Sequence, residues 1–355
     1  MPEPSDVSIL VVSYNTVDLT RQCLASLSAG TDRPYEVILV ENASSDGTVE
    51  MIRREFRSVR LIAMPRNIGF ARAVNLAARY SSGKYVLLLN PDTRMHPGTI
   101  DRLVDFARMH PEAGLVGGRT VAPSGDVDHM SCWGRPTLWS SFCYGTGLSS
   151  AFPRSSVFDP ESLGHWQRDS VREVGVVTAC LLLAPRIVWD RLGGFDERFF
   201  MYGEDLDLSL RAVQLGYHPM ITPDAVITHV SGASSGGASR RALTLRGKVT
   251  AFRKHWTPWR AHLAVDLLVL GTAARGYGAH AVNRLSGGRR GEAALVWRAV
   301  FNDRHAWSTP FPAAVDGLEG PTAPEELRFP PNPPLAVAGD PAENGATPCG
   351  DSGLA

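Results

Sequence analysis

Residues 84–92 read KYVLLLNPD, and this stretch indicates how the first part of the chain is built. Its run from Val86 to Leu89 has the continuous apolar character of a strand that is buried on both faces of a sheet. The run stops at Asn90-Pro91-Asp92, where a proline ends the strand and a carboxylate follows its tip. This carboxylate either belongs to ordinary turn chemistry or holds something positively charged.

Similar apolar runs flank this strand along the chain. They are VSILVVSY from Val7, EVILVEN from Glu36, VRLIAM from Val59 and GLVGG from Gly114. Between the runs, apolar spacing near 3.6 residues predicts helices over 17–29, 47–56, 69–80 and 97–109. Short buried strands that alternate with helices predict an α/β fold with a doubly wound, mostly parallel sheet.

The composition bounds the class of protein. The chain has 355 residues, of which 44% are hydrophobic and 20% charged, and its 36 basic and 36 acidic residues cancel. This balance gives no electrostatic argument for nucleic acid as a partner. Five scattered cysteines without a CxxC pair favour a reducing compartment. The sequence shows no signal peptide and no uncharged apolar stretch of about 18 residues, so we expect a cytoplasmic protein.

The zero net charge conceals a split near the end of the chain. Residues 241–310 hold twelve Lys/Arg against three acids, whereas residues 311–355 hold one Arg, seven acids and nine prolines. The proline-rich acidic part predicts a disordered tail. The basic part, which also carries Trp256, Trp259 and Trp297, predicts helices. Their basic face is either simply solvated, lies on a membrane surface, or contacts nucleic acid.

Polar residues follow several of the predicted strands. They include Ser13 and Tyr14, Glu41, Asn67, Asn90 and Asp92. In doubly wound sheets, ligands bind outside the carboxyl ends of the strands. We therefore expect these side chains to lie where a nucleotide would bind.

Three acids open the stretch GEDLDLSLRAVQLG, namely Glu204, Asp205 and Asp207. Acids at a helix N-terminus can simply cap free N–H groups and complement the helix dipole. Residues 199–202 offer an apolar approach, and an acid beside such a wall can keep a raised pKa and act as a general base.

His229 ends another strand-like run and precedes a Gly/Ser-rich loop. A lone histidine is often no more than a hydrogen-bonded core or surface residue. Together with Asp92, it would offer one imidazole and one carboxylate to Mg²⁺ or Mn²⁺, leaving positions open for diphosphate oxygens.

Several motifs occur in the order seen in family 2 glycosyltransferases, which are inverting enzymes of the GT-A fold. They are VSYNTVDLTRQCLASL, VILVENASSDGT, NIGFARAVN, LLLNPD and GGFDERFFMYGEDLDLSLR, followed by His229. The resemblance spans about residues 7 to 235 and is greatest for bacterial rhamnosyltransferase-like members. GGFDERFFMYGEDLDL is its most specific part.

The resemblance implies a role for each matching residue. The donor-binding positions are Ser13, Tyr14, Glu41, Asn67, Gly69, Asn75, Asn90 and Asp92. Asp92 matches the last Asp of the family's metal-binding DxD, and His229 resembles a second metal ligand found in some members. Asp205 matches the catalytic base, with Glu204, Ala179 and Tyr202 at acceptor-binding positions. Asn90 and Pro91 replace the first part of the DxD, so Asp92 supplies its one carboxylate.

The implied reaction is the transfer of a sugar, with L-rhamnose as one candidate, from a dTDP- or UDP-linked donor. The acceptor would be a hydroxyl of a glycan, a polyprenyl-linked glycan or a small metabolite, and the cofactor Mg²⁺ or Mn²⁺. The implied catalytic domain covers residues 1–240, and it divides into a donor half at about 1–120 and an acceptor half at 121–240. The helical extension over 241–310 and the tail over 311–355 follow it. The extension would contact the inner face of the cell membrane.

Two other functions are compatible with an α/β nucleotide-binding fold. A nucleotidyltransferase usually needs a Gly-rich, basic loop after its first strand, and VSYNTVDLT has no such glycines. A catalytically inactive carbohydrate- or nucleotide-binding module would be favoured if Asp92 or Asp205 were missing, and both are present. Both comparisons favour an active glycosyltransferase.

Overall fold

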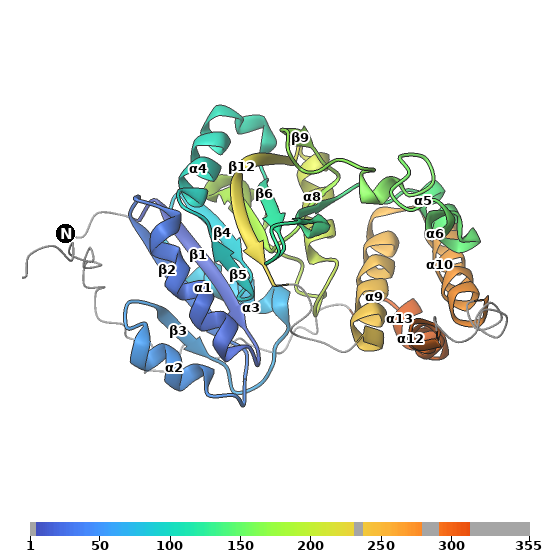
Figure 1. The fold of residues 1–355 in the computed structure, drawn as a ribbon, viewed down its shortest axis with the longest axis horizontal. Coiled ribbons are helices and arrows are strands. Elements are labelled where there is room, and N and C mark those ends of the chain that lie inside the picture. The colour runs from blue at the N-terminus through green and yellow to red at the C-terminus, as the bar shows by residue number, and fades with distance from the viewer. Residues whose placement is uncertain (1–4, 231–236, 279–290, 313–355) are drawn as a thin grey trace, which may run out of the picture.

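In the computed structural model, residues 5–230, 237–278 and 291–312 are described. Figure 1 shows a central sheet with helices on both faces, and a group of helices standing beside it at the end away from β3 (Arg60–Ala63). Residues 313–355, which make up most of the expected acidic tail, lie outside the described residues.

The strands of the central sheet follow one continuous path in the order β3-β2-β1-β4-β11-β6-β12-β5. The bounds of the others are β2 (Tyr35–Glu41), β1 (Val7–Ser13), β4 (Tyr85–Leu89), β11 (Leu181–Pro185), β6 (Val116–Val121), β12 (Met220–His229) and β5 (Thr93–Met95). Two short strands, β7 (Val127–Asp128) and β9 (Arg172–Glu173), pair with β6 and β12. A separate pair joins β8 (Cys132–Trp133) to β10 (Val176–Val177).

Strand direction divides the sheet into two parts. The four strands from β3 to β4 run parallel, as the sequence predicts. β11 is antiparallel to both of its neighbours, β4 and β6, and β12 returns parallel to β6. The sheet is therefore mixed but mostly parallel, which confirms the predicted α/β class.

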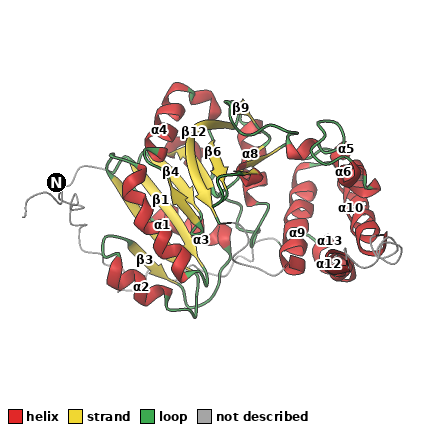
Figure 2. Ribbon diagram, viewed as in Figure 1, coloured by secondary structure: helices red, strands yellow, loops and turns green. Residues whose placement is uncertain are grey.

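Helices cover both faces of the sheet (Figure 2). Their bounds are α1 (Val17–Gly30), α2 (Thr48–Glu55), α3 (Phe70–Arg79), α4 (Thr99–Met109), α7 (Arg186–Leu192) and α8 (Glu204–Gln214). Side chains of β1 alternate between the two faces. Ile9 and Val11 pack with residues of α1 and α4, whereas Leu10 and Val12 pack with residues of α3 and α8. Burial on both faces explains why β1 and β4 are apolar throughout.

The helices beside the sheet hold a third core. They are α5 (Leu138–Thr146), α6 (Leu148–Ala151), α9 (Gly237–His255), α10 (Pro258–Ala273), η4 (Ala274–Gly278), α12 (Gly291–Asn302) and α13 (Arg304–Ser308). Phe252, Leu268 and Trp307 are buried in the centre of this group. The boundary expected after residue 240 falls within α9. Among the described residues, no helix is both long and apolar enough to cross a bilayer.

Candidate active site

The register of two strands brings Asp92 and His229 together. Asp92 follows the buried strand β4 and directly precedes β5, and β5 pairs antiparallel with β12 so that Thr93 lies opposite His229. The backbone N–H of Val230 also donates to the carbonyl of Asp92 (2.9 Å). As a result, Nε2 of His229 lies 3.5 Å from Oδ1 of Asp92. That Oδ1 is buried and accepts no hydrogen bond from a described residue.

Asp128, at the end of β7, orients the histidine. Its Oδ2 lies 2.6 Å from Nδ1 of His229, so the ring presents its other nitrogen to Asp92. Burial of the ring lowers its pKa, but the hydrogen bond with Asp128 and the negative charges of Asp92 and Asp128 outweigh burial and raise the pKa of His229 to about 9. A carboxylate that fixes the outer nitrogen of a histidine is the usual partner of a metal-binding imidazole.

A tight turn presents the acid pair at the start of α8. Tyr202 (φ 66°) and Gly203 (φ 92°) both have left-handed backbone conformations, and the helix begins immediately afterwards at Glu204. Glu204 is 5% exposed, and its Oε2 has no hydrogen-bond partner among the described residues. Oδ1 of Asp205 accepts a hydrogen bond from the N–H of Leu206 (2.8 Å).

The environment separates the proton affinities of these two acids. Burial, and then the negative charge of Asp205, raise the pKa of Glu204 well above its usual range. Burial also raises the pKa of Asp205, but backbone N–H groups of Leu206 and Ala179 stabilise its charged form and oppose this effect. When the pair holds a single proton, these effects favour Glu204 as the protonated member and Asp205 as the charged one.

One cavity of about 470 Å³ joins the two acidic sites, within the size range of small-molecule sites. The N–H of Asn90 donates to the carbonyl of Cys180 (3.2 Å), which connects the turn before Asp92 to the segment that contacts Asp205. The predicted site residues that line the cavity are Tyr14, Asn67, Asn90, Asp92, Ala179, Tyr202, Glu204, Asp205 and His229.

At the donor end, the cavity wall is built from an asparagine pair and an aromatic ring. Asn42 donates to Oδ1 of Asn67 (2.9 Å) and accepts a hydrogen bond from the N–H of Ile68 (2.9 Å). These bonds fix the loop that precedes α3. Tyr14 is 42% exposed at the rim, where its ring can stack on a flat ligand group.

The other predicted donor residues stand behind this wall. Ser13 is fully buried and bonds to Thr20, while the Glu41 carboxylate accepts from the N–H and hydroxyl of Ser44. A side chain at Gly69 would meet the carbonyl of Phe200 at 2.6 Å, so this glycine allows α3 and the loop before α8 to touch. Asn75 bonds to the backbone of Phe195 on the same loop. These four residues shape the cavity without lining it.

The opposite end of the cavity includes residues that sequence reasoning did not single out. Helix α9 contributes Arg240, Thr244 and Lys248, β8 contributes Trp133, and the short 3-10 turn Pro160–Ser162 contributes Glu161. Lys248 pairs with Glu161 at 2.6 Å. The basic character of residues 241–310 was a signal for this role, but the sequence does not show which basic residues face the cavity.

Comparisons with known proteins agree with this geometry. Residues 8–162 match the family described as "Glycosyl transferase family 2". An N-acetylglucosaminyl-diphospho-decaprenol L-rhamnosyltransferase of Mycobacterium tuberculosis is 32% identical over 272 residues, covering 72% of this chain and 87% of that protein. The O-antigen biosynthesis protein RfbC of Myxococcus xanthus is 31% identical, over 64% of this chain and 17% of its own length.

Solved structures share the fold at low identity. A mannosyltransferase of Pyrobaculum calidifontis, in complex with GDP-Man and Mn²⁺, aligns with a TM-score of 0.51 and 20% identity over 86% of this chain and 84% of its own. GalNAc-T7 with UDP, GalNAc and Mn²⁺ aligns with a TM-score of 0.53 and 14% identity, over 86% and 57% of the two chains. Both are GT-A glycosyltransferases, so the predicted GT-A fold is confirmed. The chain is a glycosyltransferase and belongs to glycosyl transferase family 2.

Proposed function

We propose that the protein transfers a sugar from a nucleoside-diphosphate donor to an acceptor hydroxyl in a single displacement that inverts the anomeric carbon. The observation that supports this most is the placement of two unlike acidic sites in one cavity. Asp92 and His229 lie at the end where the strands of the donor half finish, and the acid pair lies at the start of α8. L-Rhamnose is the sugar we favour, because it is the sugar in the name of the mycobacterial relative.

The acid pair divides the proton chemistry. Asp205, which carries the negative charge of the pair, takes the proton from the acceptor hydroxyl. The acceptor oxygen then forms a bond to the anomeric carbon, and the bond between that carbon and the diphosphate oxygen breaks with its electron pair. Glu204, which holds a proton, donates a hydrogen bond to a neighbouring acceptor oxygen; this contact would satisfy its unpartnered Oε2.

A divalent metal fits between Asp92 and His229. Oδ1 of Asp92 is buried and accepts no hydrogen bond from a described residue, and Asp128 directs Nε2 of His229 toward it. Once the ring releases its proton, these two atoms would be an oxygen and a nitrogen ligand. The described residues contain no cluster of three or more His, Cys, Asp or Glu that could hold an ion, so the donor diphosphate would complete the site. A bound Mg²⁺ or Mn²⁺ would stabilise the charge that develops on the departing diphosphate as a Lewis acid.

For the acceptor we favour a polyprenyl-diphosphate-linked glycan over a soluble metabolite. The mycobacterial relative is named for a diphospho-decaprenol acceptor, and α9 places the cations Arg240 and Lys248 at the far end of the cavity. We also propose that residues 241–310 contact the cytoplasmic face of the membrane. Trp259 is 63% exposed on α10, and Arg253 and Arg260 lie close to it in sequence.

A donor panel tests this function. The protein would be incubated with dTDP-, UDP- and GDP-linked sugars, with either a short polyprenyl-diphosphate-linked N-acetylglucosamine or free N-acetylglucosamine, and the released nucleoside diphosphate measured. We expect release above background with one donor class, and more with the lipid-linked acceptor. Release with free sugar alone would favour a soluble acceptor, and no release with any donor would contradict the proposal.

Membrane contact is measured separately, by co-sedimentation with liposomes that contain anionic lipid. Binding should weaken as salt rises, because the attraction of basic residues to the surface is screened. Intact protein that stays in the supernatant at low salt would contradict the membrane contact while leaving the transfer reaction untouched.

A further inference from the structure

Helix α9 touches the catalytic turn directly, although it lies beyond residues 8–162. A side chain added at Gly247 of α9 would meet the carbonyl oxygen of Tyr202 at 2.1 Å, and one at Gly203 would meet Gly247 Cα at 2.8 Å. Backbone therefore packs on backbone immediately before the acid pair. This contact leaves no room for the turn to move toward α9.

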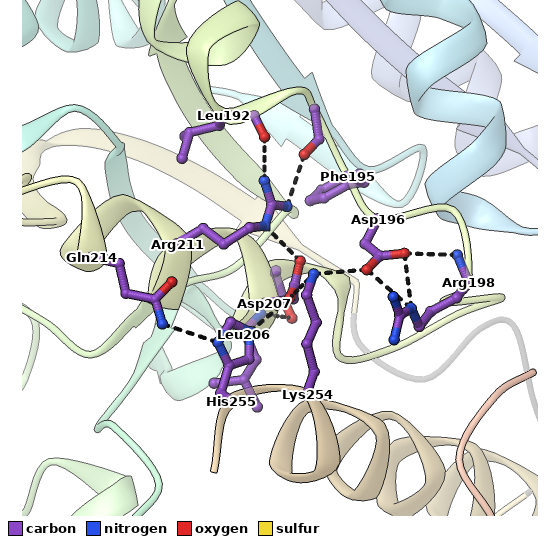
Figure 3. Close-up of polar contacts among 12 residues, drawn as sticks. Leu192, Phe195, Asp196, Arg198, Leu206, Asp207, Arg211, Gln214, Lys254 and His255 are labelled. Carbon is purple, nitrogen blue, oxygen red and sulfur yellow. Dashed lines mark hydrogen bonds and ion pairs between the residues drawn. The ribbon is translucent and has the colours of Figure 1, made fainter. Parts of the chain in front are cut away.

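One helical turn later, Asp207 ties α8 to the last turn of α9. Asp207 is fully buried, and its carboxylate lies 2.7 Å from Nζ of Lys254 and 2.7 Å from Nε2 of His255 (Figure 3). Arg211, within α8 itself, binds the other oxygen at 2.8 Å. Arg211 also donates to the carbonyls of Leu192 and Gly194.

Lys254 extends the connection to the loop before the catalytic turn. Its ammonium group lies 2.7 Å from Oδ2 of Asp196, which in turn pairs with Arg198 (Figure 3). A buried carboxylate held by a lysine, an arginine and a histidine is costly to break, because loss of one partner leaves buried charge without compensation. The contacts of Asp207, Lys254 and His255 therefore form a rigid clamp between α9 and α8.

We propose that Lys254 and His255 hold the general base in its working position by clamping Asp207, two residues beyond Asp205. This inference rests on the proposed function, in which Asp205 takes the acceptor proton. Asp207, Lys254 and His255 do not line the cavity, so they act through α8 and not on the substrate. They are positioning residues, supplied by a helix that the family motifs do not include.

The test compares Asp207→Asn, Lys254→Met and Lys254→Arg in the full-length chain. Displacement of a reacting group by about 1 Å can lower the rate about 100-fold, so kcat should fall by about 10- to 100-fold in Asp207→Asn and Lys254→Met. Donor KM and donor affinity should change little, since the donor end of the cavity is untouched. Lys254→Arg keeps a cation in reach of both carboxylates and should restore most of kcat.

Asp6→Asn is the matched control. Asp6 is also a buried carboxylate with three cationic partners, Lys84, Arg33 and Arg108, and it precedes β1 at the end opposite the cavity. The six residues from Asp6 to the cavity-lining Val12 span about 20 Å of strand. Asp6→Asn should lower the melting temperature but leave kcat unchanged at temperatures where the protein is folded.

Gly247→Ala provides a second route to the same result without removing a charge. Its added methyl group must push α9 away from Tyr202, so kcat should again fall with donor affinity retained. If the wild type transfers sugar and both Asp207→Asn and Lys254→Met keep wild-type kcat while folded, the positioning role is wrong. An equal loss of kcat in Asp6→Asn would also contradict it. A wild type that transfers nothing would instead contradict the proposed function.

Discussion

The start of α8 holds acids only two or three residues apart, and their surroundings differ in one respect. Glu204 and Asp205 line the cavity and form no ion pair with a described residue; there, burial raises the pKa of both. The face toward α9 carries Asp207. Burial also opposes its ionisation, yet His255, Arg211 and Lys254 outweigh burial and lower the pKa of Asp207 to about 2.

This difference explains how the first turn of one helix can provide both a proton acceptor and a rigid attachment to a neighbouring helix. A carboxylate that must accept a proton needs low dielectric without a permanent counter-charge, because an ion pair would make it a weak base. A carboxylate that must hold a helix in place needs the counter-charges. The helical period separates these demands, since residues 205 and 207 point about 200° apart around the axis.

The largest expected effect is on the cavity face. Asp205→Asn keeps the size of the side chain and removes proton acceptance, so turnover should fall by about 10²- to 10⁴-fold with donor affinity nearly intact. Glu204→Gln is the matched variant on the same turn. Because glutamine still donates a hydrogen bond, its turnover should fall less. The reverse order of the two losses would assign the base to Glu204.

The second prediction concerns the metal at the donor end of the cavity. Chelation should abolish transfer, and Mg²⁺ or Mn²⁺ should restore it, with Asp92→Ala raising the metal requirement more than His229→Ala because the carboxylate supplies the charge. Asp128→Asn, which loosens the orientation of His229, should weaken metal affinity by about 10- to 100-fold. Metal titrations of activity separate these variants. Full transfer in excess chelator would remove the metal from the mechanism.

The third prediction is the pH dependence of turnover. The base works only when it is deprotonated, and burial raises the pKa of Asp205 above the usual 3.8. Turnover should therefore fall as pH decreases toward a pKa above 3.8, while the protein is still folded. Circular dichroism at each pH provides the control. A turnover that stays constant down to pH 4 would show that this carboxylate is not the proton acceptor.

The smallest expected effect is on stability, at the face toward α9. With a pKa of about 2 in the folded protein against 3.8 when unfolded, Asp207 contributes about 2 kcal/mol at neutral pH. This contribution is present above the unfolded pKa and is lost as pH falls through the folded one. Asp207→Asn should thus be destabilised at pH 7, and the difference from wild type should shrink between about pH 4 and pH 2. Urea unfolding at several pH values measures the free energy of unfolding of both proteins. If the difference between them does not depend on pH, the ion pairs of Asp207 are not its source.

Much of the fold could be predicted from local patterns. Apolar spacing placed the predicted helix over 17–29 within a residue of α1, and the predicted helix over 97–109 ends at the same residue as α4. The antiparallel direction of β11 could not be predicted in this way. A buried run such as Leu181–Leu183 fits a parallel or an antiparallel neighbour equally well, because both faces of the strand are covered in either case.

The candidate site was predictable only in part. Asp92, Asp205 and His229 stand in recognisable motifs, and all three line one cavity. Asp128, Lys254 and His255 stand in no motif, and their roles depend on contacts with residues 101, 47 and 48 positions away. Such contacts depend on how strands and helices pack, which local sequence does not encode. The sequence shows that residues 241–310 are basic. It does not show that Lys248 lines the cavity whereas Lys254 belongs to the clamp.

The most direct test of the single displacement is the configuration of the product. Wild-type protein would be incubated with a donor of known anomeric configuration and a saturating acceptor, and the new linkage assigned by NMR from its one-bond C–H coupling. If Asp205 is the base and the acceptor oxygen attacks the anomeric carbon from the side opposite the diphosphate, the product should have the inverted configuration. A product that retains the donor's configuration would require a covalent or front-face mechanism, and would contradict the role we assign to Asp205.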